Sequence, residues 1–152
     1  MRKLLALTGV FLACLACGGT STTATTSPSP SAGVVVIDVL GKTVKGQTED
    51  VLTNTKAMTL YYLTSDSATA VKCSGGCATN WPPLLLPSGD PAASLTLPGS
   101  LTTATTANGR QVLYQGHPLY TFVRDKTSND ANGEGINAFG GTWHVATPQT
   151  TA

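Results

Sequence analysis

The chain has 152 residues, of which nine are Lys or Arg and eight are Asp or Glu, so its formal net charge is only +1. Charged residues make up 11% of the composition and no basic stripe occurs, which excludes a protein that binds nucleic acid through phosphate contacts. Two histidines, His117 and His144, and eight scattered carboxylates leave few ways to assemble a catalytic acid–base pair or a metal centre. We therefore expect no enzymatic activity and no cofactor.

The first sixteen residues have the layout of a secretory signal. Arg2 and Lys3 form a basic segment, an apolar run extends from Leu4 to Leu12, and small residues follow up to Ala16. The apolar run is too short to span a bilayer as a helix of the mature protein. The sequence thus predicts export and removal of residues 1–16.

Cys17 directly follows Leu15-Ala16 and resembles the lipid-modified cysteine of a bacterial lipobox. In lipoproteins of that kind the thiol carries acyl chains and becomes the N-terminus, so the resemblance implies a palmitate-type membrane anchor. Two alternatives remain open: Phe11 to Cys14 is a second possible box, and an ordinary signal peptidase could cut without adding a lipid. The mature chain, with seven basic and eight acidic residues, carries too little charge to bind an anionic membrane. Membrane attachment would therefore depend on the lipid.

Residues 17–33 begin with the cysteine expected to carry the lipid, and the sixteen residues after it are rich in Gly, Thr, Ser and Pro and show no apolar periodicity. This composition predicts a disordered tether. Sixteen flexible residues have a root-mean-square span of roughly 22 Å and reach at most about 55 Å. The folded part is therefore expected close to the membrane, outside the cytoplasm, in the cell envelope.

From residue 34 to 148 the sequence predicts short strands separated by turns, followed by a tail at 149–152. Residues that are β-branched or aromatic concentrate in Val34–Ile37, Leu60–Leu63, Leu101–Thr105, Gln111–Tyr114, Leu119–Val123 and Trp143–Ala146. No window has the apolar stripe of a helix. Residues 101–123 are expected to form an antiparallel meander whose first turn contains Asn108-Gly109, a pair that tolerates positive φ. The predicted fold class is all-β and antiparallel.

Two segments of the chain repeat one another. Leu60–Asp66 matches Leu119–Asp125 at an offset of 59, and each copy continues through a Gly-containing loop to a tryptophan, Trp81 or Trp143. The repeats are expected at about residues 40–87 and 100–148. Neither repeat has enough apolar residues for a good core of its own, so we expect a pseudo-twofold sandwich or barrel with one shared core.

The motif Tyr-x-aromatic-x-x-Asp, complete in Tyr120–Asp125, resembles that of a family of predicted bacterial lipoproteins with tandem secreted repeats of unknown function. Further similarities are Cys73–Ala78 leading to Trp81-Pro82-Pro83-Leu84, and Phe139-Gly140-Gly141 ahead of Trp143. The first repeat departs from the motif, because Leu63 occupies the aromatic position. The resemblance implies export, a lipid anchor and a repeated β domain, and the family has no established activity.

The spacing of the motif predicts structural roles. The Tyr and the aromatic lie two residues apart and would share the inner face of a sheet. The Asp would fall where the strand ends, so its carboxylate could accept hydrogen bonds from loop N–H groups. A catalytic carboxylate pair is the alternative, although twofold-related carboxylates are expected on opposite rims. The residues for which we expect structural roles are Tyr61, Asp66, Trp81, Tyr120, Phe122, Asp125 and Trp143.

Cys73 and Cys77 are expected to form a disulfide, because the compartment is oxidising and Gly75-Gly76 allows a turn between them. Closing so small a ring lowers the entropy of the unfolded chain and so stabilises the fold by only about 2 kcal/mol. The expected role of the disulfide is therefore to fix the conformation of one loop. An exchangeable dithiol is the alternative. A zinc site would need His117 and His144 as further ligands.

Two other patterns are candidate metal sites. Met58 and His117 occupy equivalent positions in the repeats and could ligate copper or haem, whereas the context Gly116-His117-Pro118 favours an exposed turn. Ser128 to Glu134 has oxygen ligands at alternate positions but lacks the closing acid of a calcium loop, so a solvated loop is expected.

The sequence therefore predicts a lipid-anchored extracytoplasmic lipoprotein that is a non-enzymatic binding or structural module of the cell envelope. Its expected partners are the membrane, through the lipid, and an unidentified envelope protein or ligand. An envelope redox protein that uses a metal, haem or the Cys73/Cys77 dithiol is the alternative. A binder of carbohydrate or peptidoglycan, with the aromatic residues as a stacking platform, is a third hypothesis.

Overall fold

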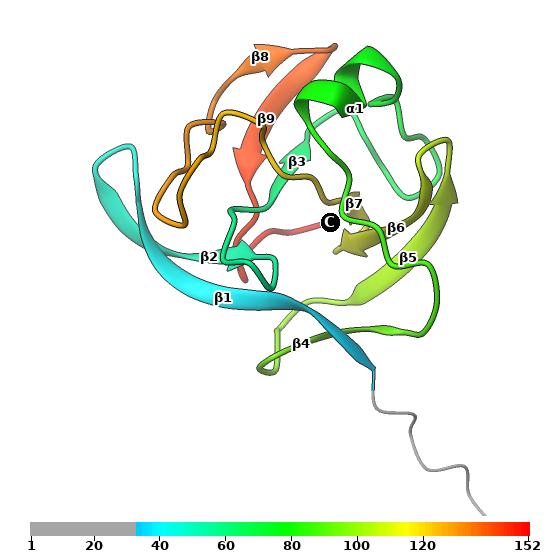
Figure 1. The fold of residues 1–152 in the computed structure, drawn as a ribbon, viewed down its shortest axis with the longest axis horizontal. Helices are drawn as coiled ribbons and strands as arrows, with labels where there is room; N and C mark the ends of the chain where they lie inside the picture. The colour runs from blue at the N-terminus through cyan, green and yellow to red at the C-terminus, as the bar shows by residue number, and fades with distance from the viewer. Residues whose placement is uncertain (1–32) are drawn as a thin grey trace, which may run out of the picture.

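The computed structural model describes residues 33–152, so the predicted signal peptide, Cys17 and nearly all of the tether lie outside the described residues. In chain order the elements are β1 (Val34–Val44), β2 (Gln47–Thr53), β3 (Tyr61–Leu63), α1 (Gly76–Asn80), β4 (Pro91–Ala93), β5 (Leu101–Thr106), β6 (Gly109–Tyr114), β7 (His117–Pro118), β8 (Asn137–Ala138) and β9 (Gly141–Val145) (Figure 1). The expected all-β class is confirmed, with one five-residue helix in this part of the chain.

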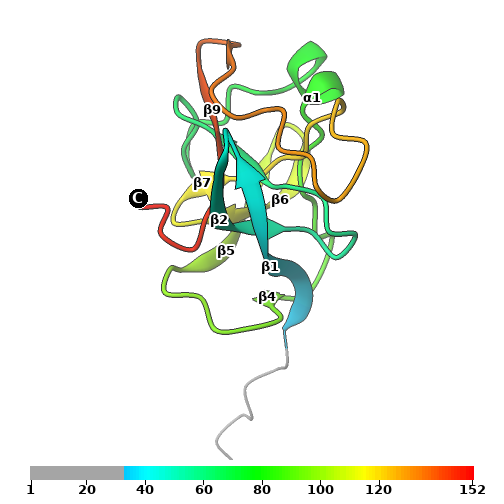
Figure 2. The same ribbon diagram turned by 90° about the vertical axis from the view of Figure 1, so that its left-hand side faces the viewer.

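The strands form three small sheets with the orders β2-β1-β4, β3-β9-β8 and β5-β6-β7. Hairpins supply most of the pairing, and residues 101–118 form an antiparallel meander that is shorter than the one predicted over residues 101–123. One pairing is parallel, between the start of β1 and β4. The other strand pairings of residues 33–152 are antiparallel, as expected. The reason for the parallel pairing is length, because β1 has eleven residues and its hairpin partner β2 only seven, which leaves the start of β1 for a returning segment (Figure 2).

Some elements differ from the sequence prediction for identifiable reasons. The first four residues of β2 are exposed and polar, so only Val51 and Leu52 carry an apolar signal. Helix α1 spans barely more than one turn, which is too short to show a period. The segment 119–123 was expected as a strand, yet only isolated bridges at Tyr120 occur there.

The turn between β5 and β6 also departs from the expected geometry. Thr106 pairs with Gly109, so Ala107 and Asn108 are the turn residues, and only Gly109 has a positive φ, at 115°. The hydroxyl of Thr106 accepts the Asn108 N–H at 3.0 Å. This turn is thus stabilised by a side-chain hydrogen bond, and Asn108 does not adopt a positive φ.

The two repeats meet at a point of local twofold symmetry. Tyr61 N–H donates to the Tyr120 carbonyl at 2.8 Å, and Tyr120 N–H donates to the Tyr61 carbonyl at 2.9 Å. Each tyrosine therefore pairs with its own counterpart. Matching bonds surround this pair, because Ala146 N–H donates to the Leu60 carbonyl and Leu84 N–H donates to the Leu119 carbonyl. These reciprocal bonds define the pseudo-twofold axis expected from the repeat.

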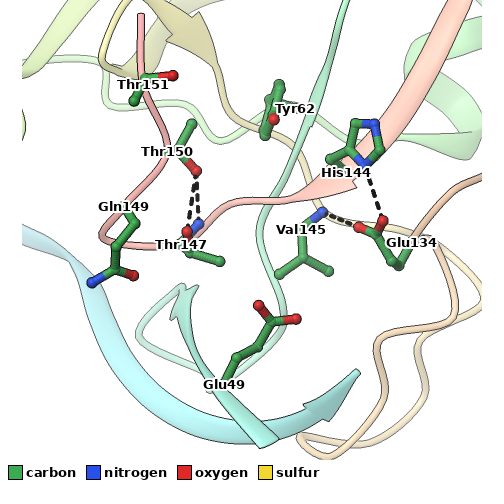
Figure 3. A pocket seen from close by; sticks show the side chains of 9 residues that line it. All are labelled: Glu49, Tyr62, Glu134, His144, Val145, Thr147, Gln149, Thr150 and Thr151. Atoms are coloured by element: carbon green, nitrogen blue, oxygen red, sulfur yellow. Dashed lines mark hydrogen bonds and ion pairs between the residues drawn. The ribbon is translucent and has the colours of Figure 1, made fainter. Parts of the chain in front are cut away.

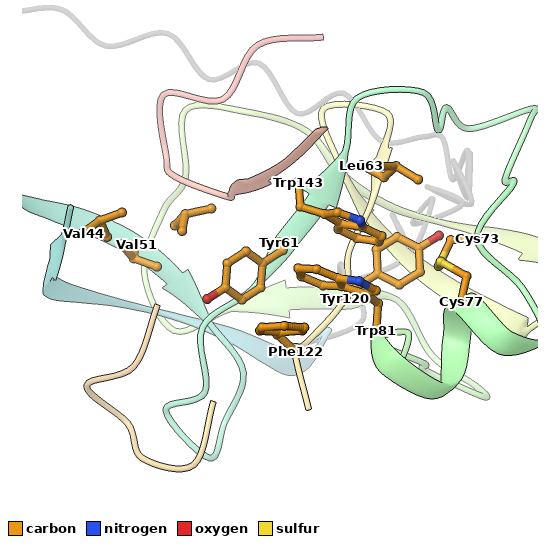
Figure 4. Close-up of a cluster of buried hydrophobic side chains, with 11 residues drawn as sticks. Val44, Val51, Tyr61, Leu63, Cys73, Cys77, Trp81, Tyr120, Phe122 and Trp143 are labelled. Atoms are coloured by element: carbon orange, nitrogen blue, oxygen red, sulfur yellow. A yellow bond between two sulfur atoms is a disulfide. The ribbon is translucent and has the colours of Figure 1, made fainter. Parts of the chain in front are cut away.

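The buried apolar residues form two clusters, and each cluster takes side chains from both repeats. The first contains Val44, Val51, Tyr61, Leu63, Cys73, Cys77, Trp81, Tyr120, Phe122, Trp143 and Val145 (Figure 4). The second contains Ile37, Leu52, Leu60, Leu86, Val112, Tyr114, Leu119 and Ala146. Because neither cluster belongs to one repeat, the interior is shared.

Candidate functional site

The tyrosine and aspartate of the repeated motif bind each other across the two repeats. Tyr61 Oη donates to Asp125 Oδ2 at 2.7 Å, and Tyr120 Oη donates to Asp66 Oδ2 at 2.7 Å. Both tyrosines are fully buried, and the aspartates are only 3% and 6% exposed. The motif of one repeat is thus completed by the motif of the other.

The second oxygen of each carboxylate holds a loop of its own repeat. Lys72 N–H donates to Asp66 Oδ1 at 2.8 Å, and Asn132 N–H donates to Asp125 Oδ1 at 3.0 Å. The expected loop-organising role is therefore present with one N–H group for each aspartate. The phenol partner was missed. Each aspartate follows a tight turn, in which the Asp66 N–H donates to the Leu63 carbonyl at 3.0 Å and the Asp125 N–H donates to the Phe122 carbonyl at 3.1 Å. Only the packed repeats show that the phenol partner comes from the other copy.

Burial raises the pKa of the Tyr61 and Tyr120 phenols far above the ordinary tyrosine range, and the hydrogen bonds to Asp125 and Asp66 add to this effect. Both phenols therefore remain protonated donors over the whole range in which proteins are usually stable. Lys42 responds in the opposite direction, because burial lowers its pKa. Its ammonium group donates to the Ala57 carbonyl and to Thr59 Oγ1, both at 2.8 Å.

We expect the free energy of unfolding to fall as the pH rises above about 10, the ordinary pKa of tyrosine. Tyr61 and Tyr120 ionise there in the unfolded chain and remain protonated in the native one, so the native state binds more protons. Each contributes a slope of up to about 1.4 kcal/mol per pH unit. The stabilisation is fully present below that pH. Because the pKa of Lys42 is lowered, this residue contributes a pH slope of opposite sign below pH 10.5. The slope of one lysine is too small to cancel that of two tyrosines.

Urea unfolding at several pH values between 8 and 11 measures this slope. The double variant Tyr61→Phe/Tyr120→Phe serves as the control, because it lacks both phenols. Its stability should depend less steeply on pH, whatever its absolute value. Equal slopes in both proteins would contradict the assignment.

The remaining motif aromatics form a ring stack at the centre of the first cluster. The rings of Trp81 and Trp143 are 3.8 Å apart and parallel to within 2°. Tyr61 meets Trp81 edge-on at 5.4 Å, and Tyr120 meets Trp143 edge-on at 5.2 Å. Phe122 stacks on Trp81 at 4.1 Å (Figure 4). Because both indoles are buried, they cannot act as a surface platform for glycans.

Cys73 and Cys77 form the expected disulfide. Both cysteines are buried in the first cluster, beside the Tyr120 ring (Figure 4). The Asn108 side-chain amide donates to the Cys73 carbonyl at 2.8 Å, which ties the disulfide loop to the β5–β6 turn of the other repeat. Burial keeps an attacking thiolate away from this bond, so the geometry favours a structural role over thiol exchange.

Tyr62 faces outward, on the opposite side of β3 from Tyr61, and both histidines pack against it. The Tyr62 ring lies 4.6 Å from that of His117 and 5.9 Å from that of His144. A polar cavity of about 340 Å³ opens at this place, bounded by β9 and the C-terminal segment (Figure 3).

The polar groups around this cavity mostly bind one another. His144 Nδ1 donates to Glu134 Oε1 at 2.9 Å, and Val145 N–H donates to Glu134 Oε2 at 2.7 Å (Figure 3). His117 Nε2 donates to the Thr151 carbonyl at 3.0 Å. The cavity therefore lies beside residues 149–152, the segment expected as a tail, which the bond from His117 holds against the fold.

The candidate metal ligands Met58 and His117 take part in different local contacts. Met58 lies in a turn closed by Asn54, whose side-chain oxygen accepts the Met58 N–H at 3.0 Å. His117 uses one nitrogen for the C-terminal segment, as described above. Within residues 33–152 no group of three or more His, Cys, Asp or Glu side chains is placed to hold a metal ion.

The predicted solvated loop at Ser128 to Glu134 is organised by its own backbone. Asp130 Oδ2 accepts the N–H groups of Lys126 and Thr127, at 2.7 and 2.8 Å, and these bonds lower the pKa of Asp130. Glu134 is engaged by His144. The two acids of this loop thus have partners within the chain.

Comparison with known proteins identifies the two repeats. A family model described as a secreted repeat of unknown function matches residues 35–85 and 102–147, which coincide with the two halves related by the pseudo-twofold axis. No curated protein and no solved structure is significantly similar to the chain. In the described part of the chain, no helix has the length and apolarity needed to cross a membrane.

Proposed function

The chain belongs to the family of secreted repeats of unknown function, and from this premise we propose that it is a lipid-anchored extracytoplasmic lipoprotein. Its two repeats form one rigid, non-enzymatic module of the cell envelope, which binds a partner or ligand or has a structural role. The observation that carries the assignment as a rigid module is the reciprocal pair of buried Tyr–Asp bonds between the repeats.

These bonds occupy the phenol and carboxylate groups of the motif, which would otherwise be available to a substrate. A carboxylate that acts as an acid or base needs an oxygen within reach of a substrate. In Asp66 and Asp125 one oxygen accepts a phenol and the other accepts a loop N–H, and both side chains are buried. The repeated motif therefore supports a scaffold, and any binding must use the surface of that scaffold.

The anchoring part of the proposal is supported by the order of segments along the chain. A signal-like stretch ends at Ala16, Cys17 follows in a lipobox-like context, and β1 begins at Val34. The intervening sixteen residues span roughly 22 Å when flexible, so a lipid at Cys17 would hold the module beside the membrane.

Metabolic labelling with a clickable palmitate analogue tests the anchor. The wild-type protein should be labelled, Cys17→Ser should not be labelled, and the matched variant Cys14→Ser should keep the label. Fractionation should then find Cys17→Ser outside the membrane fraction. An unlabelled wild-type protein would remove the anchoring proposal, and loss of the label in Cys14→Ser alone would move the acceptor to Cys14.

A further inference from the structure

A second cavity opens where the central ring stack ends. It has a volume of about 190 Å³ and is lined by Asn80, Trp81, Phe122, Arg124, Ile136, Ala138 and Phe139. Phe122 is the last ring of the stack formed with Trp143 and Trp81 (Figure 4). Unlike the polar cavity beside Tyr62, this cavity has mainly apolar walls, and it opens to solvent beside the β8–β9 hairpin.

Phe139 marks the rim of this cavity with an exposed aromatic ring. It is 46% exposed and lies at the tip of the β8–β9 hairpin with a φ of 58°. The turns at Lys45-Gly46 and Gln115-Gly116 use the same pattern of two positive φ values. Their first residues are long and polar, whereas a bulky aromatic is disfavoured at this backbone position. Local folding therefore does not account for a phenylalanine here.

Arg124 adds a positive charge to the same rim. Its side chain is exposed, one residue before the buried Asp125. Arg110 approaches Asp90, but within residues 33–152 no ion pair engages the Arg124 guanidinium. An uncommitted guanidinium is suited to a carboxylate, which it can bind with two parallel hydrogen bonds.

We propose that this cavity binds a small aromatic carboxylate, a single planar ring that carries one anionic group. The volume sets the size, because a protein cavity of about 150 Å³ accommodates benzene, while sites for drug-sized ligands are about 300 Å³ or larger. The ring contacts Phe122 and Phe139, and the carboxylate faces Arg124. This inference rests on the proposed function as a binding module and names the chemical class of its ligand.

The departure of the first repeat from the motif explains why the site occurs once. Leu63 stands in the first repeat where Phe122 stands in the second, and Leu63 pairs across the strands with Trp143. The ring stack therefore ends in an aromatic at one end only. A cavity that needs Phe122 as a wall cannot be duplicated by the pseudo-twofold axis.

Fluorine NMR of 4-fluorobenzoate, with the full-length lipoprotein in a neutral detergent, tests the proposal. The matched neutral probe is 4-fluorobenzamide, which has the same ring without the charge. We expect a dissociation constant for fluorobenzoate on the order of 1 mM and weaker binding of the amide. In Arg124→Gln, fluorobenzoate should bind about tenfold more weakly and lose its advantage over the amide.

Two further variants separate the ring contact from general effects. Phe139→Ser should weaken both probes, while Lys56→Gln, which removes an exposed cation elsewhere, should leave both unchanged. All three substitutions are at exposed positions, and unchanged thermal unfolding checks that each variant is folded. Equal binding of the two probes to the wild-type protein, or binding that Phe139→Ser leaves intact, would overturn the proposal. If the wild-type protein is a dimer and Phe139→Ser disrupts it, the cavity face is instead an interface with a second copy of the chain, which would also overturn the proposal.

These results are independent of the anchor. Palmitate labelling of Cys17 and membrane fractionation do not involve the cavity. Failure of fluorobenzoate to bind would therefore remove the ligand assignment and leave the anchoring proposal intact.

Discussion

The Tyr61→Phe substitution, which removes a single hydroxyl group, is expected to lower the free energy of unfolding by about 2–3 kcal/mol. The phenol is the donor to Asp125 Oδ2, and its loss leaves that oxygen buried without a partner. Tyr120→Phe should have a similar effect, because Asp66 is then deprived of its donor in the same way. Urea unfolding at pH 7 measures both changes.

A double-mutant cycle identifies which partners belong together. Tyr61→Phe and Asp125→Ala should be strongly coupled, with an interaction energy of about 1–3 kcal/mol, because each removes the same bond. Tyr61→Phe and Asp66→Ala, which lie in one repeat and share no hydrogen bond, form the matched control and should be closer to additive. Coupling within a repeat that exceeded coupling between repeats would contradict the crossed arrangement.

Trp143→Ala is expected to destabilise the domain by about 3–5 kcal/mol. Its ring is fully buried, stacks on Trp81 at 3.8 Å and meets the edge of Tyr120. Truncation leaves a cavity between the repeats that the reciprocal backbone bonds at Tyr61 and Tyr120 prevent from closing. A loss of this size is a large share of the 5–15 kcal/mol that holds a typical domain together.

The matched control is Phe139→Ala, which truncates an aromatic ring at the surface and should change stability by no more than about 0.5 kcal/mol. Urea unfolding measures both variants, and near-ultraviolet circular dichroism reports whether Trp81 keeps its asymmetric surroundings. A Trp143→Ala protein as stable as Phe139→Ala would show that the stack contributes little to the association of the repeats.

The inner face of the fold could be predicted from the sequence because it depends on local spacing. Tyr61 and Leu63 are two residues apart in β3, so the strand places them on one face, and both are buried. The disulfide also follows from a separation of only four residues along the chain. In both cases one short segment contains the whole pattern.

Features that join distant segments could not be predicted in the same way. The parallel pairing of β1 with β4 depends on where a long connection returns, and no residue in Pro91–Ala93 indicates its partner. The wall residues Phe122 and Phe139 come from different loops, and only the packed fold brings them to one cavity. The crossed Tyr–Asp bonds also join distant segments, and the sequence identifies the partner of each phenol only if the repeats are taken as a symmetric pair.

The self-pairing of Tyr61 with Tyr120 has a consequence for the origin of the fold. Within one repeat the phenol and the carboxylate do not bind each other, whereas two identical copies would satisfy both groups at once. The present chain is thus organised like a homodimer whose subunits have been fused by gene duplication. Fusion makes the association independent of protein concentration, and it allows the halves to diverge, as Leu63 and Phe122 have done.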